Sequence, residues 1–176
     1  MTQDEYEFHM YLEQQKAVNK LADDIRIAYD IENPINNIEE VVSKIGGIVQ
    51  YDSDCSYIEK SKKGFIIHVE DNNDQIKKFR VAQQLGKLFL YTNFIEEHEL
   101  FNNDTILLKD SYYQQGSINW INEFALAFLM PKKEYTDEVY KNTNDNIVDT
   151  KVLAKHFDVS ISAASWRGKR LGILED

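Results

Sequence analysis

The chain has 176 residues, of which 43% are hydrophobic and 12% aromatic, which is enough for one domain with a hydrophobic core and excludes a disordered chain. Its formal net charge of −10 disfavours charge-driven binding to nucleic acid or to an anionic membrane, and it permits binding to a basic protein surface. One cysteine allows no internal disulfide, the N-terminus lacks the pattern of a signal peptide, and no apolar run reaches the roughly 18 residues of a membrane span. We therefore expect a cytoplasmic protein that has no membrane partner.

The first part of the sequence predicts two helices. An apolar stripe with helical spacing predicts a long helix over about 4–30. The members of this stripe are Val18, Leu21, Ala22, Ile25, Ala28 and Tyr29. Pro34 ends the helix, because the residue before a proline avoids helical backbone angles. A second helix is expected over about 36–45, where Gly46 and Gly47 stop it.

A small sheet is predicted next. Residues 48–51 have the composition of a first strand, and residues 55–58 are expected to pair beside it. The polar residues 61–64 predict a turn into a further strand at 65–70.

A third helix is expected over 76–91, with Asp74 as its N-cap. Its apolar residues recur at helical spacing and are expected to face a core. They are Ile76, Phe79, Ala82, Leu85 and Phe89. Residues 92–116 are rich in loop-forming residues and contain a candidate short strand at 106–108.

The last part of the sequence is predicted to be mainly helical. A helix over 118–130 ends before a proline, which cannot donate a backbone hydrogen bond. A polar linker follows around 141–146. Residues 149–156 and 161–171 then predict a pair of helices that resembles a helix–turn–helix.

The third helix contains the sequence A-Q-Q-L-G-K-L at residues 82–88. By itself this is an ordinary amphipathic helix with polar residues on its wet side. It also has the layout of the zinc-protease helix A-H-E-L-G-H-L, in which histidines at positions i and i+4 bind zinc and the glutamate is the general base. Gln83 and Lys87 stand at the two histidine positions, and Gln84 stands at the glutamate position.

Two later segments strengthen the second interpretation. Residues 122–131 read N-E-F-A-L-A-F-L-M-P, and residues 153–160 read L-A-K-H-F-D-V-S. The second of them is followed at regular spacing by Ala163, Arg167, Leu171 and Gly172. In this order and spacing the three segments resemble the ImmA/IrrE family of zinc metallopeptidases, and the resemblance runs from about the first third of the chain to its end.

The resemblance implies an α+β fold of the zincin-like metallopeptidase type, with several helices, a small mainly antiparallel sheet and a C-terminal helix–turn–helix-like pair. Residues 1–131 would form a degenerate metallopeptidase-like core. Residues 132–176 would form the helical pair and pack on that core, so that the whole chain is a single compact unit.

The resemblance also implies that the zinc site has been lost. Gln83 offers a neutral amide oxygen, Lys87 offers a cation, and Gln84 has no carboxylate that could act as a base. The family's third ligand is a glutamate shortly before the asparagine that Asn122 matches, and residues 117–121 contain no carboxylate. We therefore predict no catalytic residue, no metal ligand and no zinc cofactor.

A filled cavity is the expected replacement for the metal. We expect Trp120 or Ile118 to pack over the stem of Lys87. Other metal-binding side chains are scattered and lack the spacing of a metal motif. They are His9, His68, His98, His156 and Cys55.

The C-terminal pair permits a DNA-binding interpretation, which would direct one set of side chains towards a DNA groove. These are Ser162, Ser165, Trp166, Arg167 and Lys169. Residues 149–176 contain five Lys or Arg against four Asp or Glu, a balance of +1, which is a weak electrostatic footprint for DNA. Docking of the pair onto the fold is favoured instead, through Val152, Phe157, Val159 and Leu171. Gly168 replaces the family's usual leucine, which we expect either to loosen that docking or to shape a contact surface.

Three functional hypotheses follow. The leading one is a non-catalytic, metallopeptidase-like regulator that binds a repressor or a host regulatory protein, for example as an antirepressor; the resemblance implies a phage or another mobile element as its source. Nucleic acid is not the expected partner. The candidate partner-binding residues are Trp120, Ser165, Trp166, Arg167 and Lys169. The alternatives are an active metallo-endopeptidase that cleaves a repressor with an unusual metal site, and a DNA-binding accessory module.

Overall fold

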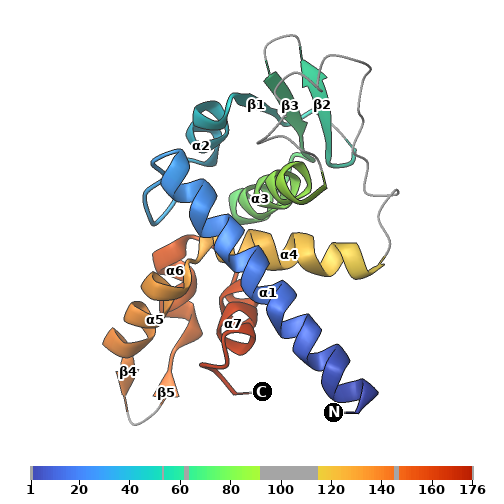
Figure 1. Cartoon of the computed structure of the whole chain (residues 1–176). Helices are drawn as coiled ribbons and strands as arrows, with labels where there is room; N and C mark the ends of the chain where they lie inside the picture. The colour runs from blue at the N-terminus through green and yellow to red at the C-terminus, as the bar shows by residue number, and fades with distance from the viewer. Residues whose placement is uncertain (1, 53, 62–63, 92–114, 145–146, 176) are drawn as a thin grey trace.

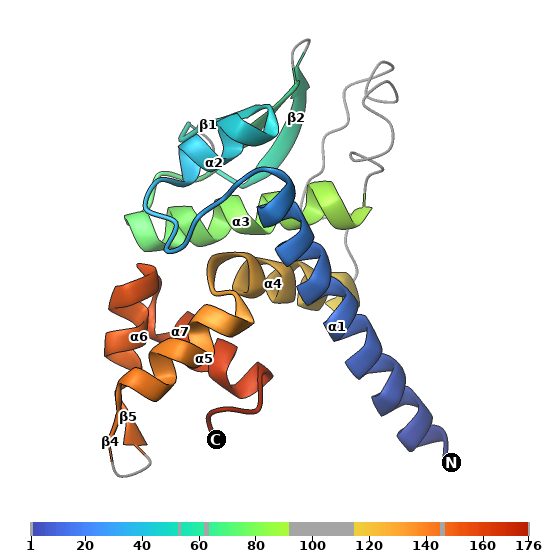
Figure 2. The ribbon, with the colours of Figure 1, turned by 60° about the vertical axis from the view of Figure 1, so that its left-hand side comes forward.

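A computed structural model describes residues 2–52, 54–61, 64–91, 115–144 and 147–175, and it has an α+β architecture (Figure 1). In chain order the elements are α1 (Gln3–Ala28), α2 (Ile38–Ile45), β1 (Gly47–Gln50), β2 (Tyr57–Ser61), β3 (Gly64–His68), α3 (Asp74–Tyr91), α4 (Gln115–Leu129), α5 (Lys132–Lys141), β4 (Thr143–Asn144), β5 (Ile147–Val148), α6 (Thr150–Phe157) and α7 (Ile161–Arg170). Figure 2 shows α3 lying between the small sheet and α4, with α5, α6 and α7 on the other side of α4.

Helix α1 begins with a capping box, in which Thr2 accepts from the Glu5 backbone and Glu5 accepts from the Thr2 backbone. Its buried residues, Val18, Ala22, Ile25 and Arg26, lie in the second half, and three of them belong to the predicted apolar stripe, whereas Ala28 of that stripe is exposed. The first turns of the helix extend away from the rest of the molecule (Figure 2). The core therefore begins at the middle of α1.

The predicted pairing of residues 48–51 with residues 55–58 is wrong, because both segments pair with β3 instead of with each other. The strand that follows residue 55 is β2, and it pairs antiparallel with β3, from Tyr57 opposite His68 to Ser61 opposite Gly64. Strand β1 pairs with the other edge of β3 and runs parallel to it, so the three-stranded sheet has the order β1-β3-β2 and is mixed. Strands β2 and β3 are closest in sequence, and they form the antiparallel pair because a short connection can join them. Strand β1 then pairs with the edge of β3 that β2 leaves free.

Glycine is required where β1 and β3 begin. A Cβ atom on Gly64 would lie 1.9 Å from the backbone oxygen of Gly46, and the φ of Gly64 is +136°. Gly46 is the left-handed C-cap of α2, as the sequence predicted, with a φ of 101°. The end of α2 therefore meets the start of β3 through backbone atoms.

The centre of the core is the contact between α3 and α4. A Cβ atom on Gly86 would lie 3.0 Å from Cδ1 of Phe124, so a glycine lets the two helices approach closely. Ala82, Leu85 and Phe89 are buried, as predicted. Ile76 is 38% exposed, which corrects the prediction that it faces the core, because the inward positions of the first turns of α3 belong to Lys78 and Val81.

The C-terminal part contains one helix that the sequence analysis missed. Helix α5 follows Pro131 directly, and the described residues 141–144 of the expected polar linker are instead the end of α5 and strand β4, which pairs with β5. Ser160 caps α7 as its sequence predicted, by accepting from the backbone N–H of Ala163. The segment 92–114, with its candidate strand at 106–108, lies outside the described residues.

The pair α6–α7 is held on the core by both apolar and polar contacts. Phe157 and Val159 are buried, as predicted, whereas Val152 is 40% exposed and does not dock. Lys78 of α3 donates to the backbone oxygen of Phe157 at 2.9 Å, where α6 ends and its carbonyls lack helical partners. None of the helices in the described ranges is long and apolar enough to cross a membrane.

Candidate functional site

The A-Q-Q-L-G-K-L segment lies in the middle of α3, where the helix is covered on almost every side. Gln84 is 1% exposed and Lys87 is 3% exposed, while Gln83 is half-buried. The interpretation of this segment as a helix with a solvated polar face is therefore wrong for two of its three polar positions. Buried polar side chains need hydrogen-bond partners, and these show how the segment is used.

The two positions that would bind zinc have different partners. The amide nitrogen of Gln83 donates to the amide oxygen of Asn122 on α4 at 2.6 Å, and its amide oxygen accepts from Nη1 of Arg80 at 3.2 Å. Nζ of Lys87 donates to the amide oxygen of Gln84 at 3.1 Å. Neutral amides therefore join α3 to α4 at Gln83 and Asn122.

Burial changes the chemistry of Lys87. Burial, helped by the positive charge of Arg80 and opposed by Cys55, lowers the pKa of the Lys87 ammonium from its ordinary value of 10.5 to about 8. Among the described residues, no group of three or more His, Cys, Asp or Glu side chains is placed to hold a metal ion.

His68 is the most buried of the scattered metal-ligand candidates that the structure describes. Its Nδ1 lies 3.0 Å from Oδ1 of Asp52, and its Nε2 lies 3.2 Å from Oε2 of Glu59. Its ring stacks on Tyr57 with 4.4 Å between the centroids. Because the carboxylates bind opposite sides of the ring, they do not converge with it on one point, and the contacts are those of a satisfied strand histidine.

A groove of about 510 Å³ opens beside the Gln83–Asn122 pair, between α3, α4 and α7. It is lined by Gln75, Ile76, Phe79, Arg80, Gln83, Asn122, Leu126, Ser160, Ser162, Ala163 and Trp166. Leu126 is 1% exposed, whereas Ile76 and Trp166 are 38% and 52% exposed. Large apolar side chains are thus presented at the surface around a concave site, which is typical of binding sites. We call this site the α3–α7 groove.

The predicted partner-binding residues are only partly brought together. Trp166 lines the α3–α7 groove, whereas Ser165 and Lys169 do not. The ring of Trp120 packs against Tyr11 of α1, with 5.1 Å between the centroids. The expected packing of Trp120 over Lys87 remains a prediction, and the side chain of Ile118 lies outside the described residues.

Arg167 is a correction to the predicted set. Its side chain is 1% exposed, its Nε donates to the backbone oxygen of Met130 at 2.8 Å, and its Nη1 donates to Oδ1 of Asn19 at 2.8 Å. Nη1 also lies 3.4 Å from Oε1 of Glu123. A guanidinium that is buried in these contacts is not exposed to a partner, and it instead holds α7 against α1 and α4.

We call Asn19, Glu123 and Arg167 the Arg167 cluster. Asn19 donates to Oε1 of Glu123 at 2.6 Å, and Nε of Arg170 lies 3.5 Å from Oε2 of the same carboxylate. Burial lowers the pKa of Arg167 to about 10, and the negative charge of Glu123 opposes this shift. The cluster therefore pairs a buried cation with a buried carboxylate. This contact gives Glu123, the residue after Asn122, a structural role.

Gly168 belongs to the same contact. A Cβ atom there would lie 2.4 Å from Cγ of Leu174 and 2.7 Å from the hydroxyl oxygen of Tyr135, whose hydroxyl donates to the Ala164 backbone at 2.6 Å. The glycine therefore permits closer docking of α7, which corrects the expectation that it loosens the pair.

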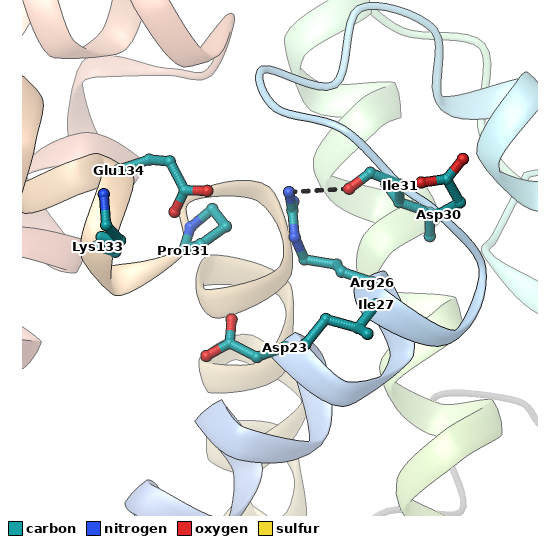
Figure 3. Close-up of a pocket in the computed structure, with 8 residues that line it drawn as sticks. All are labelled: Asp23, Arg26, Ile27, Asp30, Ile31, Pro131, Lys133 and Glu134. Carbon is teal, nitrogen blue, oxygen red and sulfur yellow. Dashed lines mark hydrogen bonds between the residues drawn. The ribbon is translucent and has the colours of Figure 1, made fainter.

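A second hollow, of about 490 Å³, lies between α1 and α5. Figure 3 shows the Arg26 side chain in this hollow, donating to the backbone oxygen of Ile31 at 3.2 Å. Arg26 also donates to the backbone oxygen of Phe128 at 2.8 Å, and burial raises the pKa of the nearby Asp23 carboxyl. Since the contacts of Arg26 fasten the end of α1 to α4, this hollow is explained by the fold, and the α3–α7 groove is the better candidate site.

No family model matches the chain, and no curated protein matches it.

Sequence reasoning missed most of the groove. Arg80, Leu126 and Ala163 were not singled out as site residues, and Ile76 and Phe79 were assigned to the core.

Proposed function

We propose that this chain is a non-catalytic regulator of the ImmA/IrrE type, with a zincin-like metallopeptidase fold, that binds a protein partner in the α3–α7 groove. The observation that carries this proposal is that Gln83 lines an apolar groove and bonds to Asn122. In this proposal Gln83 stands at a former ligand position. An amide pair in this place supports binding without hydrolysis. The partner is a repressor or a host regulatory protein in the cytoplasm, and the source is a phage or another mobile element.

The chemistry of the three altered positions supports this proposal. An amide oxygen is a poor zinc ligand, and an amide cannot act as a general base near neutral pH. At pH values below about 8 Lys87 carries a positive charge, which disfavours a divalent cation next to it. The groove can bind a chain segment without any of these functions, because it offers apolar area and hydrogen-bonding groups.

Binding can be tested with the full chain and matched variants. The tagged protein is used to capture partners, each partner is then purified, and its dissociation constant is measured by calorimetry. We expect Ala163→Trp, which fills the groove, to weaken binding at least about tenfold, which corresponds to about 1.4 kcal/mol. Tyr140→Ala is the control, since Tyr140 is 77% exposed and does not line the groove.

Two results would overturn the proposed function. The first is cleavage of a purified repressor that stops when a chelator is added, together with metal found in the purified protein, because this would establish a metallo-endopeptidase. The second is sequence-specific DNA binding in a mobility-shift assay, weakened by Lys169→Ala, in the absence of any saturable protein partner.

A further inference from the structure

The α3–α7 groove differs in charge from the rest of the protein. The chain has a formal net charge of −10, yet the described residues that line the groove include no carboxylate, and Arg80 is the one residue among them with a formal charge. The other polar lining groups are the neutral amides and hydroxyls of Gln75, Gln83, Asn122, Ser160 and Ser162. The groove is therefore a locally positive site on an acidic molecule.

The start of α7 adds to this positive character. Ser160, the N-cap, and Ser162 line the groove, so the N-terminal end of the helix opens onto it. The Ser160 side chain accepts from Ala163 and its backbone oxygen accepts from Ala164, which leaves the amides of Ile161 and Ser162 without a helical acceptor. Free amides at a helix N-terminus favour a negative group.

The apolar lining determines the rest of the ligand. Ile76, Phe79, Leu126 and Trp166 come from three helices and surround one concavity. A phosphate backbone would leave these side chains uncovered and would be repelled by the net charge of the protein. A second copy of this chain would bring a like net charge to the same surface.

We propose that the groove docks an apolar segment of a protein partner that carries a carboxylate. Apolar side chains of the segment cover Ile76, Phe79 and Trp166, and its carboxylate lies between the Arg80 guanidinium and the start of α7. This inference rests on the proposed function, because it describes what the bound partner must present.

Short synthetic peptides test the inference by fluorescence polarisation with the full chain. Three peptides share the same leucines and phenylalanines and carry either glutamate, glutamine or lysine at two positions. We expect the wild-type protein to prefer the glutamate peptide over the glutamine peptide by about tenfold at low salt. Arg80→Gln should remove this preference, and Arg80→Glu should make the lysine peptide the best ligand.

The control variant is Lys155→Glu, which makes the same charge change at an exposed residue of α6 that does not line the groove. It should keep the preference of the wild-type protein. Ala163→Trp should weaken binding of all three peptides, because it fills the apolar part of the groove.

Several outcomes would overturn the inference. They are equal or absent binding of the three peptides, a preference that Arg80→Glu leaves unchanged, displacement of the peptides by single-stranded DNA, and self-association of the chain that Ala163→Trp abolishes. If a purified partner binds saturably and Ala163→Trp does not weaken it, this inference fails while protein binding itself stands. If no protein partner binds, the proposed function fails.

Discussion

Two buried cations, Arg167 and Lys87, have different surroundings in this molecule. Arg167 lies 3.4 Å from the Glu123 carboxylate and also donates to Asn19 and to the backbone of Met130. Lys87 donates to the neutral amide of Gln84. The same physical cause, burial, lowers the pKa of both, to about 10 for Arg167 and to about 8 for Lys87.

Arg167 and Lys87 represent two ways in which a charged side chain is accommodated in the core of this protein. The Arg167 cluster joins three helices, α1, α4 and α7, and its guanidinium geometry allows several hydrogen bonds at once. The Gln84–Lys87 contact lies within one helix and contains a cation that can lose its proton near neutral pH. We therefore expect the first to matter for stability at all ordinary pH values and the second to depend on pH.

The largest effect is expected for the replacement Arg167→Met. Removing Arg167 leaves the buried Glu123 carboxylate with only the partly exposed Arg170 cation, 3.5 Å from its Oε2, which should lower the free energy of unfolding by about 3 kcal/mol. Urea denaturation measures this change. Lys169→Met, at an exposed position two residues away, should stay within about 0.5 kcal/mol. Equal effects of the two variants would contradict the role assigned to Arg167.

A medium effect is expected for Gly168→Ala, on the Arg167 side of the comparison. The new methyl group would overlap Leu174 and the Tyr135 hydroxyl, so we expect a loss of about 1–3 kcal/mol, although alanine is intrinsically the better helix former. The measurement is the urea midpoint, with Ser165→Ala on the same helix as the control. A stabilised Gly168→Ala protein would show that α7 is not docked as closely as described.

A smaller, pH-dependent effect is expected for Lys87. Its pKa is about 8 in the folded protein and 10.5 ordinarily, so the unfolded chain binds more protons between these values, and the contribution of Lys87 to stability rises with pH there. Between about pH 7 and pH 9.5 the wild-type protein should gain about 1–2 kcal/mol relative to Lys87→Met. Parallel pH profiles of the two proteins would show that Lys87 keeps its ordinary pKa.

The smallest effect on stability is expected for Trp166→Ala and Arg80→Gln, which line the groove. Both side chains are exposed, so each variant should unfold within about 0.5 kcal/mol of the wild-type protein in urea. This result would separate the groove from the buried clusters and would allow both variants in binding tests. A large loss of stability would place these residues in the core instead.

The sequence predicted the local elements more accurately than their packing. The helix that contains Gln83, the glycine stop at Gly46 and the cap at Ser160 each depend on a few neighbouring residues, and the structure confirms them. The parallel pairing of β1 with β3 was not predicted, because it depends on which edge remains free after β2 has paired. Helix α5 was missed because its exposed face carries charged and polar residues that also suit a linker.

The candidate site shows the same division. That Gln83, Gln84 and Lys87 stand close together on one helix is evident from the sequence, since their spacing along the helix sets their positions. The sequence could not show that Arg167 is buried, because its burial depends on α1 and α4, which are distant in sequence.

By itself, the sequence determined which chemical groups α3 carries and where this helix ends, because helix formation depends on residues within a few turns. The predicted start at 76 with Asp74 as N-cap is wrong, because α3 begins at Asp74 and the Asn73 side chain accepts from the backbone N–H of Ile76. The tertiary structure decided that Gln84 and Lys87 are buried, that Gln83 bonds to Asn122 and that a groove opens beside this pair. These properties arise only when α3, α4 and α7 pack together, because whether a polar side chain is solvated, paired or presented to a partner depends on the elements around it.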